Sequence, residues 1–212
     1  MNFTELQSEV ATVNLGRSDS TSLTYAGKAI NYTLQEDLVA RGLKPFLTST
    51  TVTTTADQEY VDLPSGFMGL KWAGIQQSDN DYDLLTKMDW DDYEAASATG
   101  EPDNYDILPG TSSWRMYLRL TPDDAYTIKI WYLAKPSALS GSTTSIVSTL
   151  YGDTPIISGA TWRLAVMLGI DAAIARWRRQ YIDHDLKNLL RIQDNLRGAM
   201  TVVGRSPVSP YK

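Results

Sequence analysis

Three aspartates with the spacing of calcium ligands occur in the most acidic part of the chain. Asp79, Asp81 and Asp83 repeat the first three ligand positions of an EF-hand loop. Such a loop also needs glycine at its sixth position and glutamate at its twelfth, where this chain has Leu84 and Trp90. The mismatch predicts a solvated acidic surface in place of a calcium site, and we expect no metal site.

A second run of carboxylates could supply the acid–base pair that hydrolyses a glycoside. Its members lie close together in the sequence: Asp89, Asp91, Asp92 and Glu94. Any acidic loop contains such pairs, and the spatial separation that decides the chemistry does not follow from the sequence. A solvated acidic face is the favoured interpretation, and a hydrolase acting on the cell wall is the enzymatic alternative.

The single histidine, His184, lies between Asp183 and Asp185. Adjacent residues on a helix point in different directions, so these side chains are not expected to converge on one atom. The sequence has no cysteine and no G-x-S-x-G, P-loop or G-x-G-x-x-G pattern. We therefore expect a protein that is not an enzyme, with no catalytic residues and no cofactor.

A basic cluster beside a tryptophan is a candidate binding surface. Arg176, Arg178 and Arg179 flank Trp177 in a segment with helical periodicity. Arginine pairs well with carboxylates and phosphates, so the cluster could contact nucleic acid or a carboxylate-bearing partner. We interpret it as a candidate subunit or partner interface, with a solvated helix face as the simpler alternative.

Charge is distributed unevenly along the chain. Its 212 residues carry 19 Lys and Arg against 25 Asp and Glu, which disfavours a dedicated nucleic-acid-binding protein. Residues 1–150 have 10 basic and 20 acidic side chains, whereas residues 151–212 have 9 and 5. The N-terminal sequence lacks the pattern of a secretory signal, and no apolar run is long enough for a membrane span. We expect no membrane association.

Helical signals occur towards both ends of the chain. Thr4 and Gln7 match a capping box, and apolar residues then recur every three to four positions in two predicted helices. The same periodicity returns after Pro155, which is a favourable first residue of a helix. Residues 151–200 are predicted to form a long helix that is either a bent rod or broken near residues 181–185.

Between these helices the sequence changes to threonine, β-branched and aromatic residues, punctuated by Gly, Pro and Asp. The predicted strands are residues 50–55, 60–63, 69–75, 114–120 and 126–133. Residues 76–106 contain many turn-forming residues and predict a long, exposed hairpin or loop.

The predicted fold class is therefore α+β. Residues 1–46, the N-terminal helices, and residues 151–200, the long C-terminal helix, are expected to form a helical bundle. Residues 47–150 are expected to be an inserted antiparallel β-domain. Residues 201–212 contain Gly204, Pro207 and Pro210 and predict an extended tail.

This order of blocks resembles the head-to-tail adaptor proteins of tailed bacteriophages, also called head completion or connector proteins. Five segments carry the resemblance. In the first half of the chain they are the second helix, which leads through residues 44–47 into a Thr-rich strand, and the strand and Leu-Pro step of residues 60–67. Further along they are the Gly-x-Pro turn of residues 100–102 followed by Tyr105, the segment 120–127 with Tyr132 and Pro136, and the Ala-rich helix 160–181. The resemblance covers nearly the whole chain.

The resemblance implies a structural role in the virion. Such proteins form a ring, commonly of about twelve copies, beneath the portal protein at the neck between capsid and tail. The ring extends the DNA channel, through which DNA passes without specific binding, and gives the tail or nozzle protein its attachment platform. By the same resemblance, the chain would be made in the host bacterial cytoplasm.

Within this role, the C-terminal tail is the candidate for docking to the portal. Arg205, Tyr211 and Lys212 would become ordered on binding, whereas a frayed terminus without a partner is the alternative. A different function is a carbohydrate- or receptor-binding virion module with tryptophan rings that stack on sugars. Its candidate platforms are Trp72, Trp90, Trp114 and Trp131.

Overall fold

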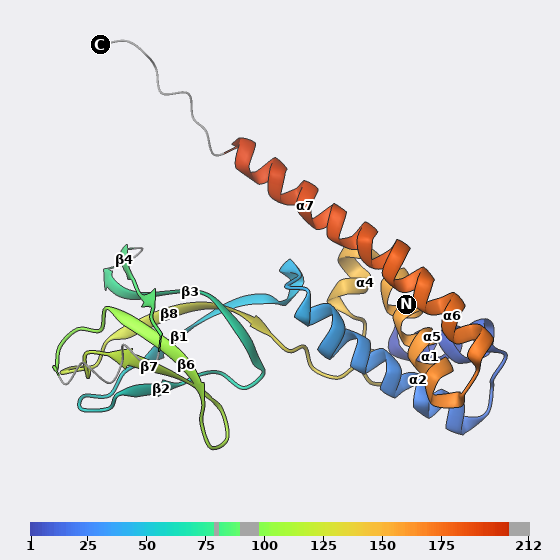
Figure 1. The fold of residues 1–212 in the computed structure, drawn as a ribbon, viewed down its shortest axis with the longest axis horizontal. Helices are drawn as coiled ribbons and strands as arrows, with labels where there is room; N and C mark the ends of the chain where they lie inside the picture. Colours follow the sequence, from blue (N-terminus) through green and yellow to red (C-terminus); the bar gives the residue numbers. More distant parts are fainter. Residues whose placement is uncertain (79–80, 90–97, 204–212) are drawn as a thin grey trace, which may run out of the picture. The chain divides into compact units, whose positions relative to one another are not determined.

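The computed structural model describes residues 1–78, 81–89 and 98–203 (Figure 1). It contains helices together with antiparallel sheets, which confirms the α+β fold class. The chain forms two compact units. We call Met1–Pro45 with Ser137–Lys212 the helical unit, and Phe46–Pro136 the β unit.

Two helices begin the helical unit, and each continues into a π-helical segment. The elements are α1 (Phe3–Ser8), η1 (Glu9–Val13), α2 (Ser20–Tyr32) and η2 (Thr33–Leu38), followed by the 3-10 turn η3 (Lys44–Phe46). Both predicted N-terminal helices are therefore present.

The first helix begins at a capping box that differs from the predicted one. The Asn2 side chain accepts a hydrogen bond from the Glu5 backbone N–H (2.9 Å), and the Glu5 carboxylate accepts one from the Asn2 N–H (2.8 Å). The predicted pairing of Thr4 with Gln7 was wrong because the Thr4 hydroxyl donates to the carbonyl of Gly141.

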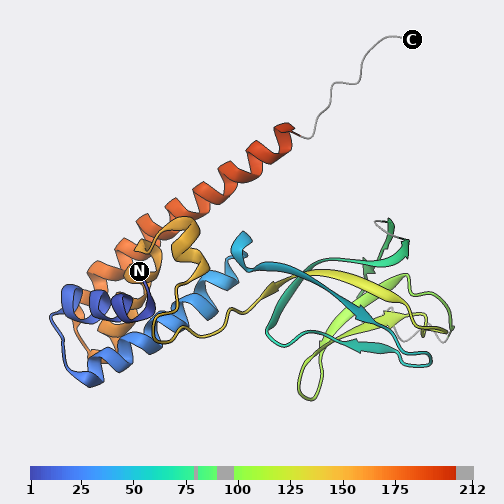
Figure 2. The same cartoon turned by 180° about the vertical axis from the view of Figure 1, so that it is seen from behind.

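The C-terminal part of the helical unit contains several helical segments, shown from behind in Figure 2. They are α4 (Ile146–Tyr151), α5 (Thr154–Leu168), α6 (Asp171–Arg179), the π-helical η4 (Gln180–Asp185) and α7 (Leu186–Val203). The segments α6, η4 and α7 follow one another without a gap, as one continuous helix.

The long helix expected over residues 151–200 is interrupted at a different place from the predicted one. Gly169 has a φ of 66°, in the left-handed region that glycine enters without steric cost, and this residue ends α5. Near residues 181–185 the chain stays helical, because the π-helical η4 joins α6 to α7 without a break in the helix.

The helical unit has its own apolar core. Its members come from α1, η1, α2, η2, α5 and α7 and are fully or almost fully buried: Leu6, Val10, Ile30, Leu34, Leu38, Ile156, Leu164, Leu186 and Leu189. Gly159 lies at a close approach of α5 to its neighbours. A Cβ atom there would be 2.8 Å from Thr33 Cγ2 and 3.0 Å from Tyr181 Cε2. The absence of a side chain at Gly159 lets these helices pack closely.

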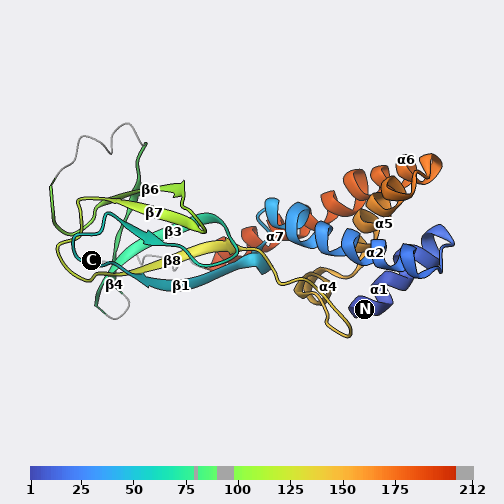
Figure 3. The ribbon, with the colours of Figure 1, turned by 90° about the horizontal axis from the view of Figure 1, so that it is seen from below.

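The β unit consists of two four-stranded sheets, whose strands are seen from below in Figure 3. The first has the order β1 (Leu47–Thr53), β8 (Thr127–Ala134), β3 (Phe67–Ser78) and β4 (Asp81–Leu84). The second has the order β2 (Tyr60–Asp62), β7 (Trp114–Arg119), β6 (Asn104–Pro109) and β5 (Thr86–Lys87). All pairs are antiparallel except β5 with β6, which is parallel.

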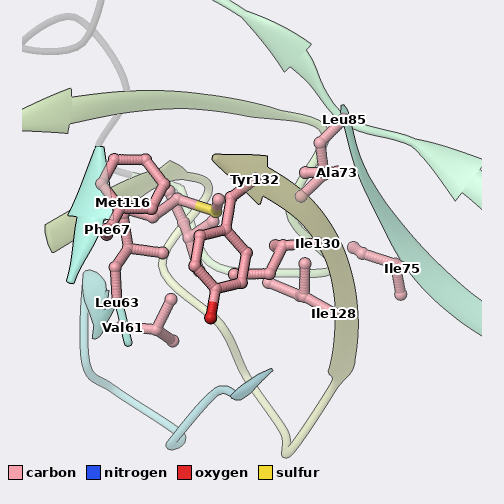
Figure 4. Packing of buried hydrophobic residues seen from close by; sticks show 11 residues of the cluster. Val61, Leu63, Phe67, Ala73, Ile75, Leu85, Met116, Ile128, Ile130 and Tyr132 are labelled. Carbon is pink, nitrogen blue, oxygen red and sulfur yellow. The ribbon is translucent and has the colours of Figure 1, made fainter. Parts of the chain in front are cut away.

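Side chains from the two sheets meet in one apolar core (Figure 4). Alternation along β8 places Ile128, Ile130 and Tyr132 inside, while Trp131 is exposed. Met116 on β7 is fully buried in the same cluster. The predicted strands of this region are all present, with bounds shifted by up to three residues.

One part of the predicted β-domain needs correction, and a second contains more strands than expected. Residues 137–150 belong to the helical unit and contain the start of α4, because Asn31 on α2 bonds both the N–H and the carbonyl of Leu139. Residues 76–106, expected as a long, exposed hairpin or loop, include the hairpin of β3 with β4, and also β5 and the start of β6. Backbone pairing there takes place despite the many turn-forming residues.

Among the described residues, no helix is both long enough and apolar enough to span a membrane.

Candidate functional site

The predicted basic cluster lies on α6, a helix with no buried residue. Arg176, Arg178 and Arg179 are exposed, and Trp177 is half-buried. The guanidinium of Arg176 lies 5.3 Å from the centroid of the Trp177 ring, a cation–π distance. The structure therefore places Arg176 beside the indole. Arg179, three residues further along the helix, is a neighbour of Arg176, and Arg178 lines a hollow together with Arg179.

Two shallow hollows of about 370 Å³ each border this cluster on either side of Ala175. Arg176 and Arg179 line one hollow, and Arg178 and Arg179 line the other. Ala175, which lines both hollows, is itself exposed. Because the surface is shallow and cationic, its chemistry suits carboxylates on another macromolecule better than an enclosed small molecule.

A third hollow, of about 340 Å³, lies where α6 and η4 approach α5 and η1. Its walls include Trp177 and the buried carboxylate of Asp185. One oxygen of Asp185 accepts a hydrogen bond from Gln180 Nε2 at 3.0 Å, and the other has no partner among the described residues. The hollow lacks a nucleophile paired with a base, so it does not have the arrangement of a hydrolytic site.

The residues around His184 diverge, as the helical geometry predicted. Asp183 pairs with Lys187 (3.1 Å), Asp185 bonds Gln180, and His184 itself is exposed. In residues 1–78, 81–89 and 98–203, no three His, Asp or Glu side chains are close enough together to hold a metal ion.

Several predicted residues lie outside the described part of the chain. They are the tail residues Arg205, Tyr211 and Lys212, the aspartates Asp79, Asp91 and Asp92, and also Trp90 and Glu94. Of the calcium-like group, Asp81 and Asp83 are exposed on β4.

The described tryptophans of the sugar-binding alternative do not share one surface of a single sheet. Trp72 on β3 is opposite Trp131 on β8, and Trp72 also packs edge-on against Tyr82 at 5.7 Å between ring centroids. Trp114 belongs to β7 in the other sheet and is 46% exposed.

An acidic surface on the β unit was missed in the sequence. Asp123 and Asp124 lie in the turn before β8, where the Tyr126 hydroxyl donates to Asp123 at 2.7 Å. This bond, together with burial and the nearby charges of Asp123, Glu101 and Asp124, raises the pKa of Tyr126 to about 12. The Asp-Asp turn was the available signal, but its proximity to Glu101 depends on tertiary structure.

Comparison with known proteins gives the same assignment as the order of elements. The SU10 adaptor protein family model matches residues 1–207. No curated protein matches the chain. Because the family model covers almost the whole chain, the match applies to both units. The chain therefore belongs to the SU10 adaptor protein family, a family of phage head-to-tail adaptors.

Proposed function

We propose that this chain is a head-to-tail adaptor that forms a ring under the portal vertex, extends the DNA channel and provides the platform for the tail or nozzle. The ring would contain about twelve copies in the neck of the virion, after synthesis in the host cytoplasm. The observation that carries the proposal is the match of a phage adaptor family to residues 1–207.

The charge distribution supports a conduit that DNA passes without being held. The β unit has 15 acidic and 6 basic side chains, and the helical unit has 10 and 13. A channel wall rich in carboxylates repels phosphates, whereas clustered Lys and Arg would retain them. On this proposal, the acidic β unit would not bind DNA specifically.

The helical unit would act as a bundle that packs around the ring. In this arrangement Arg176, Arg178, Arg179 and Trp177 supply a subunit or partner interface. Residues 201–212 would be an extended docking arm, with Arg205 and Lys212 pairing with portal carboxylates and Tyr211 burying its ring.

Co-sedimentation with the portal ring encoded in the same genome tests this function. Purified chain should sediment with the portal at a fixed ratio, and images of the complex should show a second ring below it. A folded chain that ignores both the portal and portal-bearing capsids would overturn the adaptor role. Glycan binding by such a chain would favour the carbohydrate- or receptor-binding alternative.

Deletion of residues 202–212 tests the docking arm separately. The shortened chain should lose most of its binding to the portal while keeping its helical content by circular dichroism. A matched control that replaces Ser206 and Ser209 with alanine keeps the charged and aromatic residues and should bind normally. Unchanged attachment after the deletion would contradict a docking role for the arm.

A further inference from the structure

The exposed face of α6 has the properties of a docking surface that lacks its partner in the described chain. None of its nine residues is buried. Arg178 and Arg179 have no acidic residue within ion-pair distance in the part of the chain that the structure describes. The nearest carboxylate along the helix, Asp183, is already paired with Lys187 at 3.1 Å.

The β unit has a surface of opposite charge, which we call the acidic end: Asp57, Glu101, Asp123 and Asp124. All four side chains are exposed. None of them has a Lys or Arg within ion-pair distance among the described residues.

Backbone hydrogen bonds hold the acidic end in place. The Asp57 N–H donates to the Pro122 carbonyl at 2.9 Å, and the Gly100 N–H donates to the Thr121 carbonyl at 3.0 Å. The Asp124 carbonyl accepts a bond from the Thr54 hydroxyl at 2.9 Å. The three segments that carry the carboxylates are therefore joined to one another, and this preorganisation lowers the entropy that binding would cost.

We propose that the exposed face of α6 docks onto the acidic end of a second copy of this chain. Arginine binds carboxylates in a fork geometry, and the half-buried Trp177 adds apolar area beside them. Charge complementarity identifies the occupant, since each copy carries both an unpaired basic surface and an unpaired acidic one.

This inference rests on the proposed function, a ring of adaptor copies, and it supplies the interface between neighbouring copies. The two surfaces are different, so the contact is heterologous and repeats from copy to copy until the rotation closes it into a ring. The interface is ionic and exposed at its rim, and its strength should therefore fall as salt increases.

Cysteine cross-linking tests the contact without background, because the chain contains no cysteine. The variants Arg178→Cys and Asp124→Cys, made with different mass tags, are mixed and treated with a short bismaleimide, both free at high concentration and on the portal. The mixture should give a cross-linked dimer of the two tags. Its yield should be roughly tenfold above that of a Lys28→Cys and Asp124→Cys mixture, because the contact raises the local concentration of the two thiols.

Lys28 is a matched control because it is an exposed basic residue on α2 in the same unit. A yield no greater than this control, in both the free and the portal-bound samples, would overturn the contact. If cross-linking does not exceed the control but the unmodified chain still sediments with the portal, this interface is refuted and the adaptor role is unaffected. Failure of sedimentation refutes the adaptor role instead.

Charge reversal gives a second, independent test. One variant carries Arg176→Glu, Arg178→Glu and Arg179→Glu, and the other carries Glu101→Lys, Asp123→Lys and Asp124→Lys. All of these positions are exposed, so both variants should fold, which circular dichroism checks. Each variant alone should fail to form rings, because its own two surfaces then repel.

An equal mixture of the two variants should assemble, because every contact between unlike copies is again between opposite charges. Copies would alternate around the ring, which requires an even copy number. Rings formed by either variant alone would contradict the proposal. A different outcome is that the unmodified chain retains DNA, whereas the triple glutamate variant loses DNA binding but still assembles rings. The arginines of α6 would then bind phosphates instead of carboxylates.

Discussion

Arg163 on α5 forms an ion pair with Asp37 in η2, and the same guanidinium lies against two aromatic rings. It is 4.8 Å from the centroid of Tyr32 and 4.7 Å from that of Trp162. Burial raises the pKa of Asp37 although the charges of Arg163 and Arg41 oppose this shift. The attraction therefore does not fully compensate for the removal of the carboxylate from water.

Replacing only the arginine should be more damaging than replacing the pair. Arg163→Met leaves Asp37 partly buried without its partner and should lower the free energy of unfolding by about 2 kcal/mol. The double variant Arg163→Met/Asp37→Leu should recover more than half of that loss, because no charge is left to desolvate. Urea denaturation followed by circular dichroism measures both. A double variant less stable than Arg163→Met would contradict the attribution of the loss to an unpaired, partly buried Asp37.

Gly159→Ala should destabilise the helical unit. The added methyl would lie 2.8 Å from Thr33 Cγ2 and 3.0 Å from Tyr181 Cε2, inside normal contact distance. The resulting strain should cost about 1–3 kcal/mol and exceed the helix propensity of roughly 1 kcal/mol gained over glycine. The thermal unfolding midpoint measures the change.

Gly27→Ala on α2 is the control for this substitution. Its new methyl would lie 2.7 Å from Gln7 Nε2 and 3.0 Å from Phe3 Cζ. Both side chains are only partly buried and can move aside, whereas Thr33 and Tyr181 are buried. The loss of stability should therefore be smaller than for Gly159→Ala, and the reverse order would contradict the assignment of Gly159 as a packing contact.

The stability contribution of Asp62 should depend on pH. Hydrogen bonds from Arg115 Nε and Ser113 Oγ, both 3.0 Å, hold the pKa of Asp62 below its usual value. A carboxyl whose pKa is lower when folded stabilises above its unfolded pKa, and this contribution disappears as the pH falls through the folded pKa.

Comparison with Asp62→Asn measures this effect. Urea denaturation should show the largest difference in stability at about pH 6 and a shrinking difference towards about pH 2. Ser113→Ala removes one of the two bonds and should give an intermediate result. A difference that stays constant across this range would show that Asp62 acts through packing or its neutral hydrogen bonds.

Strand β1 is an edge of its sheet and contains no charged residue, which favours pairing with other chains. Ser49→Lys places a charge at an exposed position of this strand and should reduce aggregation during refolding while leaving the unfolding midpoint unchanged. Light scattering after dilution from urea measures the difference. Ser49→Thr, which adds no charge, should aggregate like the unmodified chain.

Local signals in the sequence identified most helices and strands, but fewer of the residues at which they begin and end. The periodicity of α2 and α5 and the alternation of β8 depend on neighbouring residues and were readable. The end of α5 at Gly169 was not predicted. An isolated glycine within an apolar run is weak evidence for a helix end when the surrounding residues keep the helical periodicity. Strand β6 escaped notice because one inward position is Asp106, which is buried and accepts a bond from the Ile107 N–H at 2.8 Å.

The candidate surfaces follow the same division. The arginines of α6 are close in sequence, so their cluster was visible before the fold was known. The acidic end joins residues from three segments, and the proximity of Glu101 to the Asp123–Asp124 turn is set by the pairing of distant backbone, as at Thr99 and Thr121. No local pattern reports such a contact.

The π-helical conformation of η4, as well as the identity of its residues, determines which side of α7 faces the core. Because η4 accommodates a residue beyond the regular α-helical repeat, it turns α7 by about 100° relative to an uninterrupted helix. That rotation directs Leu186 and Leu189 into the core immediately after a helix with no buried residue. Deletion of the exposed Asp183 would thus remove the extra residue and no core side chain, and a regular α-helix through this point would still direct Leu186 and Leu189 into the core.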